Sequence, residues 1–408
     1  MEPGQATPPR WTADLLRREI GLATGCTEPA AIALCARAAA HALGTPPERV
    51  IAQADVGTHK NALAVGLPGT KLRGPAAAAA LGACATGAPA TLDVLGAASA
   101  AHREQARALV AADAATAEPL AERGLRIEVS VMAGRRTATA TVAERHDRVV
   151  AISVDDSPQS TPGPSVAVAP DDGAVIERLG DAAAIVAAAE SLRHEGLTVV
   201  DAALRHNLQL AEDLLEEQRN CPVRLVTAIV NRRMKGRSMA VATAGGSGNS
   251  GLTVSLGYWT ATAGAKHSRD RRLRGLALAH LANLAIKARI GRVGPLCGGV
   301  SASATAVGCG IAWLEGRGVA GVDRVMTTMV DAHAGTLCDG ANATCAIKIG
   351  VALRTAIEIA RSGEDGDGGD GLEGSDTAQA LRRLGGIAAA TGPTLDKRLL
   401  ALLTAGPD

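Results

Sequence analysis

Four of the eight cysteines lie in settings that could carry chemistry. Cys26 lies in the turn Gly25-Cys26-Thr27-Glu28-Pro29, directly before an Ala-rich segment that is predicted to be a helix. A helix start offers free N–H groups and the positive end of the helix dipole, both of which stabilise a thiolate. We therefore expect a lowered pKa and thiolate character for Cys26, although a cysteine in a capping turn is more often structural.

The second set of cysteines consists of Cys297, Cys338 and Cys345. Glycine follows Cys297 directly and Cys338 after one residue, which lets the backbone approach a bulky group and supplies N–H donors to sulfur. The chain has no Cys-x-x-Cys pair, so a structural zinc site is not predicted. Three widely spaced thiolates would suit an iron–sulfur cluster with one iron open to substrate. On spacing alone, three buried apolar cysteines explain the pattern equally well.

Other polar residues could bind the carboxylate of a small substrate. The loop Gly246-Ser247-Gly248-Asn249-Ser250-Gly251 offers N–H groups, hydroxyls and an amide, but it lacks the lysine and spacing of a nucleotide-binding loop. Taken alone, a plain connector is the more common explanation for such a loop. Lys60-Asn61 and Lys348 could add charge, although a solvated lysine is the default. His146 is expected to be an ordinary surface histidine near the end of a strand.

Hydrophobic periodicity predicts the elements that must position these residues, and the fold class is α+β. An N-terminal domain over 1–165 contains helices and a sheet, and its helical start at 10–45 is expected to pack on a mainly helical second domain over 166–408. The best linker candidate is the Pro- and Ser-rich segment 155–172, and 362–376 is predicted to be an acidic loop. In the first domain, helices are predicted at 10–21, 30–42, 76–85 and within 93–113, and strands at 50–56, 62–67, 125–131, 136–142 and 148–154. In the second, helices are predicted at about 174–190, 198–217, 268–290, 299–315, 320–333, 342–361 and 377–404.

Composition narrows the class of protein. The net charge is +1 and aromatic residues make up only 1%, which argues against a nucleic-acid binder and against a base-stacking surface. A core of Ala, Val, Leu and Gly must pack its backbones closely. No signal peptide and no apolar stretch of about 18 residues is evident, so we expect a cytoplasmic protein without structural disulfides. Cys35, Cys84 and Cys309 are predicted to be core residues.

These motifs resemble the L-cysteine desulfidase family, which is related to the alpha chain of bacterial iron–sulfur L-serine dehydratases. The similarity runs through most of the chain in matching order, and its most specific parts are the turn at 25–29 and Cys338-Asp339-Gly340-Ala341. The other matching segments are Lys60-Asn61, Pro68-Gly69-Thr70, the Ala-rich run at 76–82, Gly246-Ser247-Gly248-Asn249, Leu296-Cys297, Ala312-Trp313-Leu314 and Cys345-Ala346-Ile347-Lys348.

The resemblance implies a [4Fe–4S] cluster held by Cys297, Cys338 and Cys345, with Cys26 as the base or as a further ligand. The implied reaction is β-elimination of L-cysteine to pyruvate, ammonia and sulfide without pyridoxal phosphate. The substrate-binding residues would then be Lys60, Asn61, Ser247, Gly248, Asn249 and Lys348.

The chain also departs from the family pattern at Glu144–Val149 and at Gly57-Thr58-His59, so the substrate need not be cysteine. Three alternatives therefore stay open. They are an iron–sulfur L-serine or L-threonine dehydratase, an eliminase or desulfurase for a modified amino acid, and a cluster-free binding or regulatory homologue. The expected partner is a small amino acid, with no nucleic acid and no membrane, and a homodimer is left open.

Overall fold

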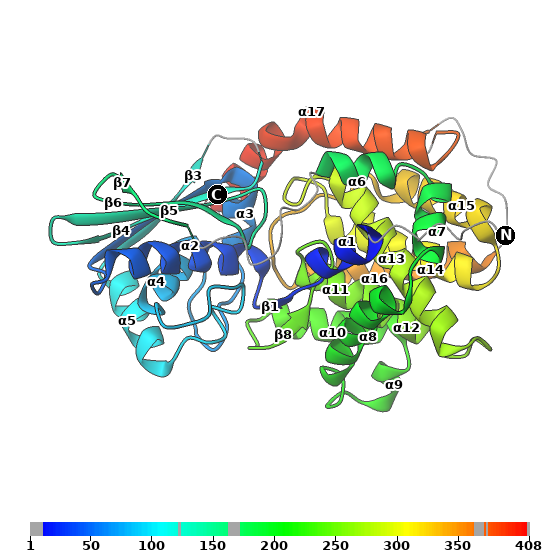
Figure 1. Cartoon of the computed structure of the whole chain (residues 1–408), viewed down its shortest axis with the longest axis horizontal. Helices are drawn as coiled ribbons and strands as arrows, with labels where there is room; N and C mark the ends of the chain where they lie inside the picture. The colour runs from blue at the N-terminus through cyan, green and yellow to red at the C-terminus, as the bar shows by residue number, and fades with distance from the viewer. Residues whose placement is uncertain (1–10, 121–123, 162–171, 363–370, 373, 406–408) are drawn as a thin grey trace, which may run out of the picture.

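The computed structural model describes residues 11–120, 124–161, 172–362, 371–372 and 374–405. The fold is α+β, as predicted. A sheet-containing part built from the first half of the chain lies beside a larger helical part built mainly from the second half (Figure 1). The predicted boundary at 165/166, and most of the segments 155–172 and 362–376, lie outside the described residues.

The larger sheet has six strands in the order β3-β2-β4-β5-β6-β7. Strands β2 and β3 run parallel, and the other neighbours are antiparallel. Apolar residues alternate with polar ones along β4, so Ile127, Val129 and Val131 point to the same face of the sheet, where they are fully buried. The strands of this sheet are β2 (Arg49–Asp55), β3 (Ala115–Leu120), β4 (Arg126–Ala133), β5 (Arg136–Ala143), β6 (Val149–Val154) and β7 (Ser157–Pro158).

Helices α2 (Thr27–Leu43), α4 (Pro75–Cys84) and α5 (Ala100–Ala111) form layers below this sheet in the view of Figure 1. Small residues let α2 and α4 approach closely, since a Cβ on Gly82 would lie 2.1 Å from the carbonyl oxygen of Ala33. The expected close packing of an aromatic-poor core is therefore present in this layer.

The helical part surrounds the long buried helix α13 (Arg269–Ile290). Two short π-helices, η1 (Thr253–Gly257) and η2 (Gly299–Ala304), interrupt its regular helices. The other helices are α1 (Trp11–Glu19), α6 (Asp172–Arg178), α7 (Ala182–Glu190), α8 (His194–Gln209), α9 (Glu216–Arg219), α10 (Pro222–Met234), α11 (Gly248–Leu252), α12 (Tyr258–Ala261), α14 (Thr305–Leu314), α15 (Gly318–His333), α16 (Thr344–Ser362) and α17 (Thr377–Thr404).

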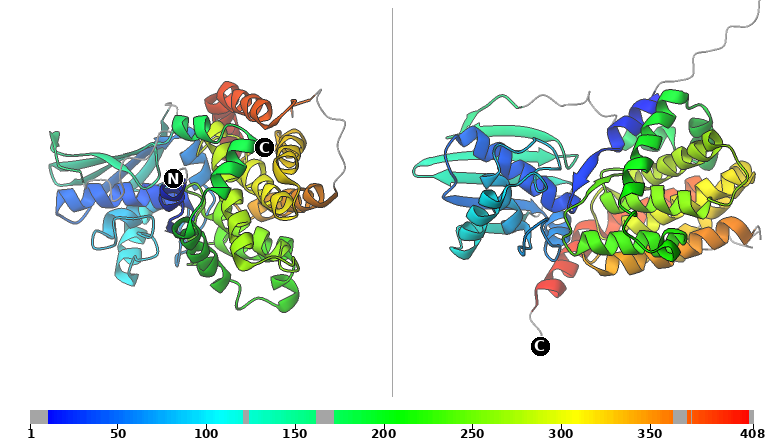
Figure 2. Two further views of the ribbon diagram at one scale, coloured as in Figure 1. Left: turned by 45° about the vertical axis from the view of Figure 1, so that its right-hand side comes forward. Right: turned by 90° about the horizontal axis from the view of Figure 1, so that it is seen from below.

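Two links join the sheet-containing part to the helical part. Strand β1 (Leu22–Thr24) pairs antiparallel with β8 (Ala240–Ala242), which places the Gly-rich loop after β8 beside the end of α1, where the Gly245 N–H donates to the Glu19 carbonyl at 3.1 Å. The short helix α3 (Val56–Ala62) packs on α17, which lies along the helical part and reaches the sheet-containing part at its C-terminal end (Figure 1 and Figure 2). The two links bring candidate residues from both halves of the chain together.

Some predicted elements are wrong or missing. A strand was expected at 62–67, but the chain forms helix α3 up to Ala62 and then an irregular turn. The Asp55 carboxylate caps α3 by accepting a hydrogen bond from the Thr58 N–H at 2.9 Å. Strand β3 and helix α10 were not predicted from the sequence. The omission of α10 has consequences for the site, because one wall of the pocket comes from that helix.

Candidate active site

A pocket of about 100 Å³ lies where the two parts meet. A water molecule needs roughly 10–15 Å³ by the same measure, so the space suits a ligand of several non-hydrogen atoms. Its walls come from the start of α2, the β5–β6 turn, α10, the 245–250 loop and the end of α13. The predicted residues Cys26, Asn61, Ser247, Asn249, Cys297, Cys338 and Cys345 all line it.

Cys26 occupies the N-cap position of α2 and is 6% exposed. The turn before it needs glycine, because Gly25 has φ +79° and a Cβ there would lie 2.7 Å from Pro68 Cγ. The prediction that the pKa of the Cys26 thiol is lowered is wrong. Burial raises the pKa of Cys26 well above its usual value, and the neighbouring Glu28 carboxylate raises it further.

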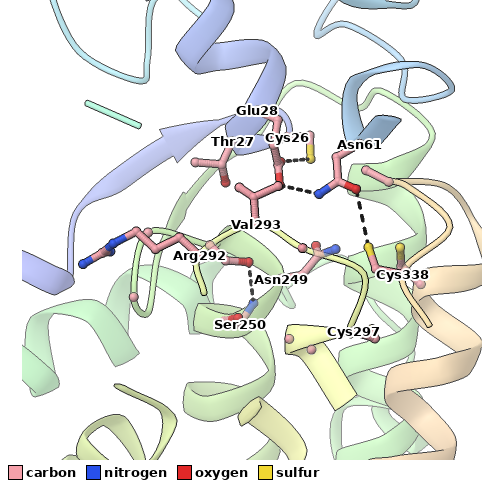
Figure 3. A pocket seen from close by; sticks show the side chains of 18 of the residues that line it. Cys26, Thr27, Glu28, Asn61, Asn249, Ser250, Arg292, Val293, Cys297 and Cys338 are labelled. Carbon is pink, nitrogen blue, oxygen red and sulfur yellow. Dashed lines mark hydrogen bonds between the residues drawn. The ribbon is translucent and has the colours of Figure 1, made fainter. Parts of the chain in front are cut away.

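A chain of hydrogen bonds runs from Cys26 to Cys338 (Figure 3). The Cys26 thiol donates to Glu28 Oε2 at 3.0 Å, and Asn61 Nδ2 donates to Glu28 Oε1 at 3.0 Å. The Cys338 thiol then donates to Asn61 Oδ1 at 3.5 Å. Burial opposes ionisation of Glu28, but nearby His146 and the bonds from Cys26 and Asn61 hold the pKa of its carboxyl below the usual value. Glu28 is therefore an ionised acceptor next to a thiol.

Cys297 and Cys338 are neighbours because their loops pair. Leu296 and Leu337 form an antiparallel bridge. The Cys297 N–H donates to the Thr336 carbonyl at 2.9 Å, and the Cys338 N–H donates to the Pro295 carbonyl at 2.7 Å. Cys345 lies near the start of α16, where its thiol donates to the Gly340 carbonyl at 3.7 Å.

The three thiols lie close enough to repel one another when charged. Burial raises the pKa of Cys297 to about 12 and of Cys345 to about 11, and Cys338 adds to both shifts. Within the part of the chain that the structure describes, no three acidic, histidine or cysteine side chains converge as they would on a single metal ion. A cluster makes a different demand, because each cysteine binds its own iron.

The Gly-rich loop is organised as a helix start. Ser247 caps α11 by accepting from the Ser250 N–H at 3.3 Å, and π-helix η1 follows directly. The other π-helix, η2, begins two residues after Cys297. Single π-helical turns are frequent at functional sites, and here η2 contributes Gly299 to the pocket lining. Gly248 does not line the pocket; a Cβ there would lie 2.5 Å from Arg233 Nη2, so the glycine makes room for that guanidinium.

Neither predicted lysine lines the pocket. Lys60 is fully buried and pairs with Asp396, and its ammonium group also donates to the Cys338 carbonyl. Lys348 pairs with Asp339 at 2.6 Å and donates to the Leu337 carbonyl. Both lysines therefore stabilise the loop that carries Cys338 through hydrogen bonds to its backbone carbonyls.

Three further residues line the pocket. Arg233 and Lys287 were not selected from the sequence, and His146 was assigned to the surface. Arg233 is 1% exposed, and its Nη1 donates to Asn249 Oδ1 at 2.7 Å. Lys287 donates to the carbonyls of Ala244 and Gly245, and burial lowers its pKa to about 8. His146, expected at the surface, is 5% exposed. Of these three residues, only Lys287 could have been recognised from the sequence, because it follows a mostly apolar segment that is predicted to be a helix.

The sequence of this chain is similar to known proteins over most of its length. The model of the serine dehydratase alpha chain family matches residues 122–401. A UPF0597 protein of Oleidesulfovibrio alaskensis is 33% identical over 394 residues, covering 90% of this chain and 91% of the relative. The chain belongs to the serine dehydratase alpha chain family. UPF0597 proteins of Desulfotalea psychrophila and Photobacterium profundum are each 29% identical over 96% of this chain.

Family membership confirms the resemblance at the level of the family and places the chain among lyases of the dehydratase kind. The names of the UPF0597 relatives specify no substrate. None of the described helices is both long enough and apolar enough to cross a bilayer.

Proposed function

We propose that this protein is a lyase that catalyses β-elimination on a small L-amino acid without pyridoxal phosphate. L-cysteine is the first candidate substrate, giving pyruvate, ammonia and sulfide. A [4Fe–4S] cluster held by Cys297, Cys338 and Cys345 would be its cofactor. The observation that carries the proposal is the gathering of these cysteines and Cys26 around one small pocket, although they are spread over the chain.

The donor set fits such a cluster. All three thiols are free, line the pocket and are soft ligands suited to iron. Glycines lie beside two of them, and Gly340 has φ +93°, so that its backbone packs against the Lys60 carbonyl oxygen. When bound, such a cluster supplies a Lewis-acidic iron that favours departure of the β-substituent.

Cys26 and Glu28 together supply the proton acceptor for the α-carbon. A buried thiol is a poor base, but its proton points to the ionised Glu28 carboxylate at 3.0 Å. Transfer of that proton to Glu28 leaves a thiolate facing the pocket, which can then remove the α-proton of the substrate. Asn61 holds the carboxylate in place during both steps.

The 247–249 loop and the nearby cations would hold the substrate carboxylate. Arg233 fixes the Asn249 amide, and Lys287 fixes the backbone of the loop. A preorganised loop with positive charge behind it is suited to bind a carboxylate.

L-serine is the second candidate substrate, and the name of the matching family favours it. The two reactions differ only in the leaving group, which is hydroxide instead of sulfide. A direct comparison of the two substrates separates them.

The decisive experiment is anaerobic purification, reconstitution with iron and sulfide, and assay of pyruvate with L-cysteine and L-serine. We expect iron-dependent pyruvate formation, with sulfide released from cysteine. Cys297→Ser should lose most of the bound iron and the activity. Cys84→Ser is the matched control, because Cys84 is 8% exposed like Cys297 but lies outside the pocket. A colourless protein that takes up no iron and forms no pyruvate would refute the proposal.

A further inference from the structure

His146 is the most unusual polar residue of the pocket. It lies in the turn between β5 and β6, is 5% exposed, and neither ring nitrogen has a hydrogen-bond partner. A buried polar group without a partner costs folding free energy, because it has lost its hydrogen bonds to water. Because the ring lines the pocket, a ligand bound there would remove that cost.

The turn that carries His146 is firmly held. Arg145 donates to Glu19 Oε1 at 3.0 Å and to the Arg18 carbonyl at 2.9 Å, and it also pairs with Asp147. Glu19 in turn accepts two hydrogen bonds from Arg292, both at 3.0 Å. This network anchors the β5–β6 turn to the end of α1, so His146 does not swing freely out of the pocket.

Burial keeps the His146 ring neutral. It lowers the pKa of the imidazole to about 4, and the cations Arg292 and Lys287 act in the same direction. Glu28 and Asp147 oppose the shift. A neutral imidazole has one N–H donor and one acceptor nitrogen, so at neutral pH His146 can accept a hydrogen bond from a cationic group.

Charge is unevenly distributed around the pocket. The buried cations Arg233 and Lys287 come from the helical part, and within the described residues neither forms an ion pair with a carboxylate. Glu28 and His146 come from the sheet-containing part and are acceptors. Buried charges are normally compensated, so the pocket as a whole favours a ligand with one anionic end and one cationic end.

We propose that His146 accepts a hydrogen bond from the α-ammonium group of an amino-acid substrate whose carboxylate lies toward Arg233 and Lys287. The inference rests on the proposed function for the class of ligand. It adds a specificity-determining residue, because His146 and Glu28 would distinguish an amino acid from a simple carboxylic acid.

The test is anaerobic binding calorimetry on the iron-reconstituted protein with L-alanine, propionate and ethylamine. L-alanine carries both charged groups but no leaving group, so it binds without turnover. We expect the wild-type protein to bind L-alanine at least about tenfold more tightly than either analogue, in line with hydrogen bonds to charged groups. His146→Leu should weaken binding of L-alanine about tenfold and leave the affinity for propionate unchanged.

His280→Leu is the matched control. His280 is also buried, at 2% exposed, and its Nε2 has no partner, but it does not line the pocket. His146→Gln, which keeps an acceptor atom, should recover part of the lost affinity. Iron content and melting temperature show whether each variant keeps its cluster and its fold.

Three results would overturn the inference: no binding of L-alanine to the wild-type protein, undiminished binding by His146→Leu, or equal weakening of L-alanine and propionate. The proposed function fails separately. If L-alanine binds through His146 but neither cysteine nor serine yields pyruvate, the lyase assignment falls and the inference stands. If pyruvate forms but His146→Leu binds L-alanine normally, the inference falls and the lyase assignment stands.

Discussion

The ammonium nitrogen of Lys60 lies 2.7 Å from Asp396 Oδ1, and the two side chains are 0% and 7% exposed. Lys60 belongs to α3 and Asp396 to the last helix, α17. The same nitrogen donates to the Cys338 carbonyl at 2.5 Å. One buried ion pair therefore joins the sheet-containing part, the C-terminal helix and a loop of the proposed cluster site.

Removing Lys60 should be strongly destabilising. Lys60→Met leaves the Asp396 carboxylate buried and uncompensated, which typically costs about 3–5 kcal/mol of unfolding free energy. The double variant Lys60→Met/Asp396→Leu should regain much of that loss, because both charges are gone. Urea unfolding measures both. Lys348→Met is the control, since its pair with Asp339 is partly exposed and is expected to contribute at most about 1 kcal/mol. A Lys60→Met protein as stable as Lys348→Met would contradict this account.

The role of Lys60 illustrates what sequence patterns reveal. Alternation in 126–154 predicted strands β4 to β6, and the cysteine settings predicted residues that the fold does bring into one pocket. Lys60 stands directly beside Asn61, which lines the pocket, yet its own side chain points into the protein interior. Direction within a short helix depends on tertiary contacts such as Asp396, which lies more than 300 positions away.

Loss of the Cys26 thiol should abolish activity and leave the cofactor in place. Both Cys26→Ser and Glu28→Gln break the path for the thiol proton, and removal of an acid–base group typically lowers the rate about 10²–10⁴-fold. The readouts are kcat for pyruvate formation and iron content. Cys221→Ser is a matched control, because Cys221 is also the N-cap of a helix without a side-chain capping bond. A Cys26→Ser protein with full iron and full activity would exclude Cys26 as the base.

Gly248 should tolerate no side chain. A Cβ there would lie 2.5 Å from Arg233 Nη2 and 2.6 Å from Val241 Cγ2, and Arg233 is held by Asn249. We expect Gly248→Ala to lower the unfolding free energy by about 1–3 kcal/mol, the usual cost of overpacking, and to raise KM. Thermal unfolding and substrate titration measure the two effects. Gly264→Ala, which meets no atom within 4 Å, should change neither, and similar behaviour of the two variants would contradict the packing argument.

The sequence offered no signal that Arg233 and His146 line the pocket. Arg233 lies in α10, a helix that the periodicity analysis missed, and its text Asn-Arg-Arg-Met resembles an ordinary solvated face. His146 lies in a polar turn, Glu-Arg-His-Asp-Arg, whose neighbours are mostly charged. What buries them is the approach of the two parts of the molecule, and local sequence carries little information about such distant contacts.

His280 should make the stability of the protein depend on pH. It lies in α13 at 2% exposed, and burial lowers its pKa to about 4. An unfolded histidine titrates near 6.5, so below that pH the unfolded state binds a proton before the folded state does. The resulting loss of stability begins as pH falls through about 6.5 and is complete near 4. Between pH 6.5 and 5 it amounts to about 2 kcal/mol, at about 1.4 kcal/mol per unit. His280→Leu should remove this part of the pH dependence, so the difference between urea unfolding free energies at pH 7 and pH 5 shrinks by that amount. An identical pH dependence in the variant and the wild-type protein would show that the folded state accommodates a charged His280.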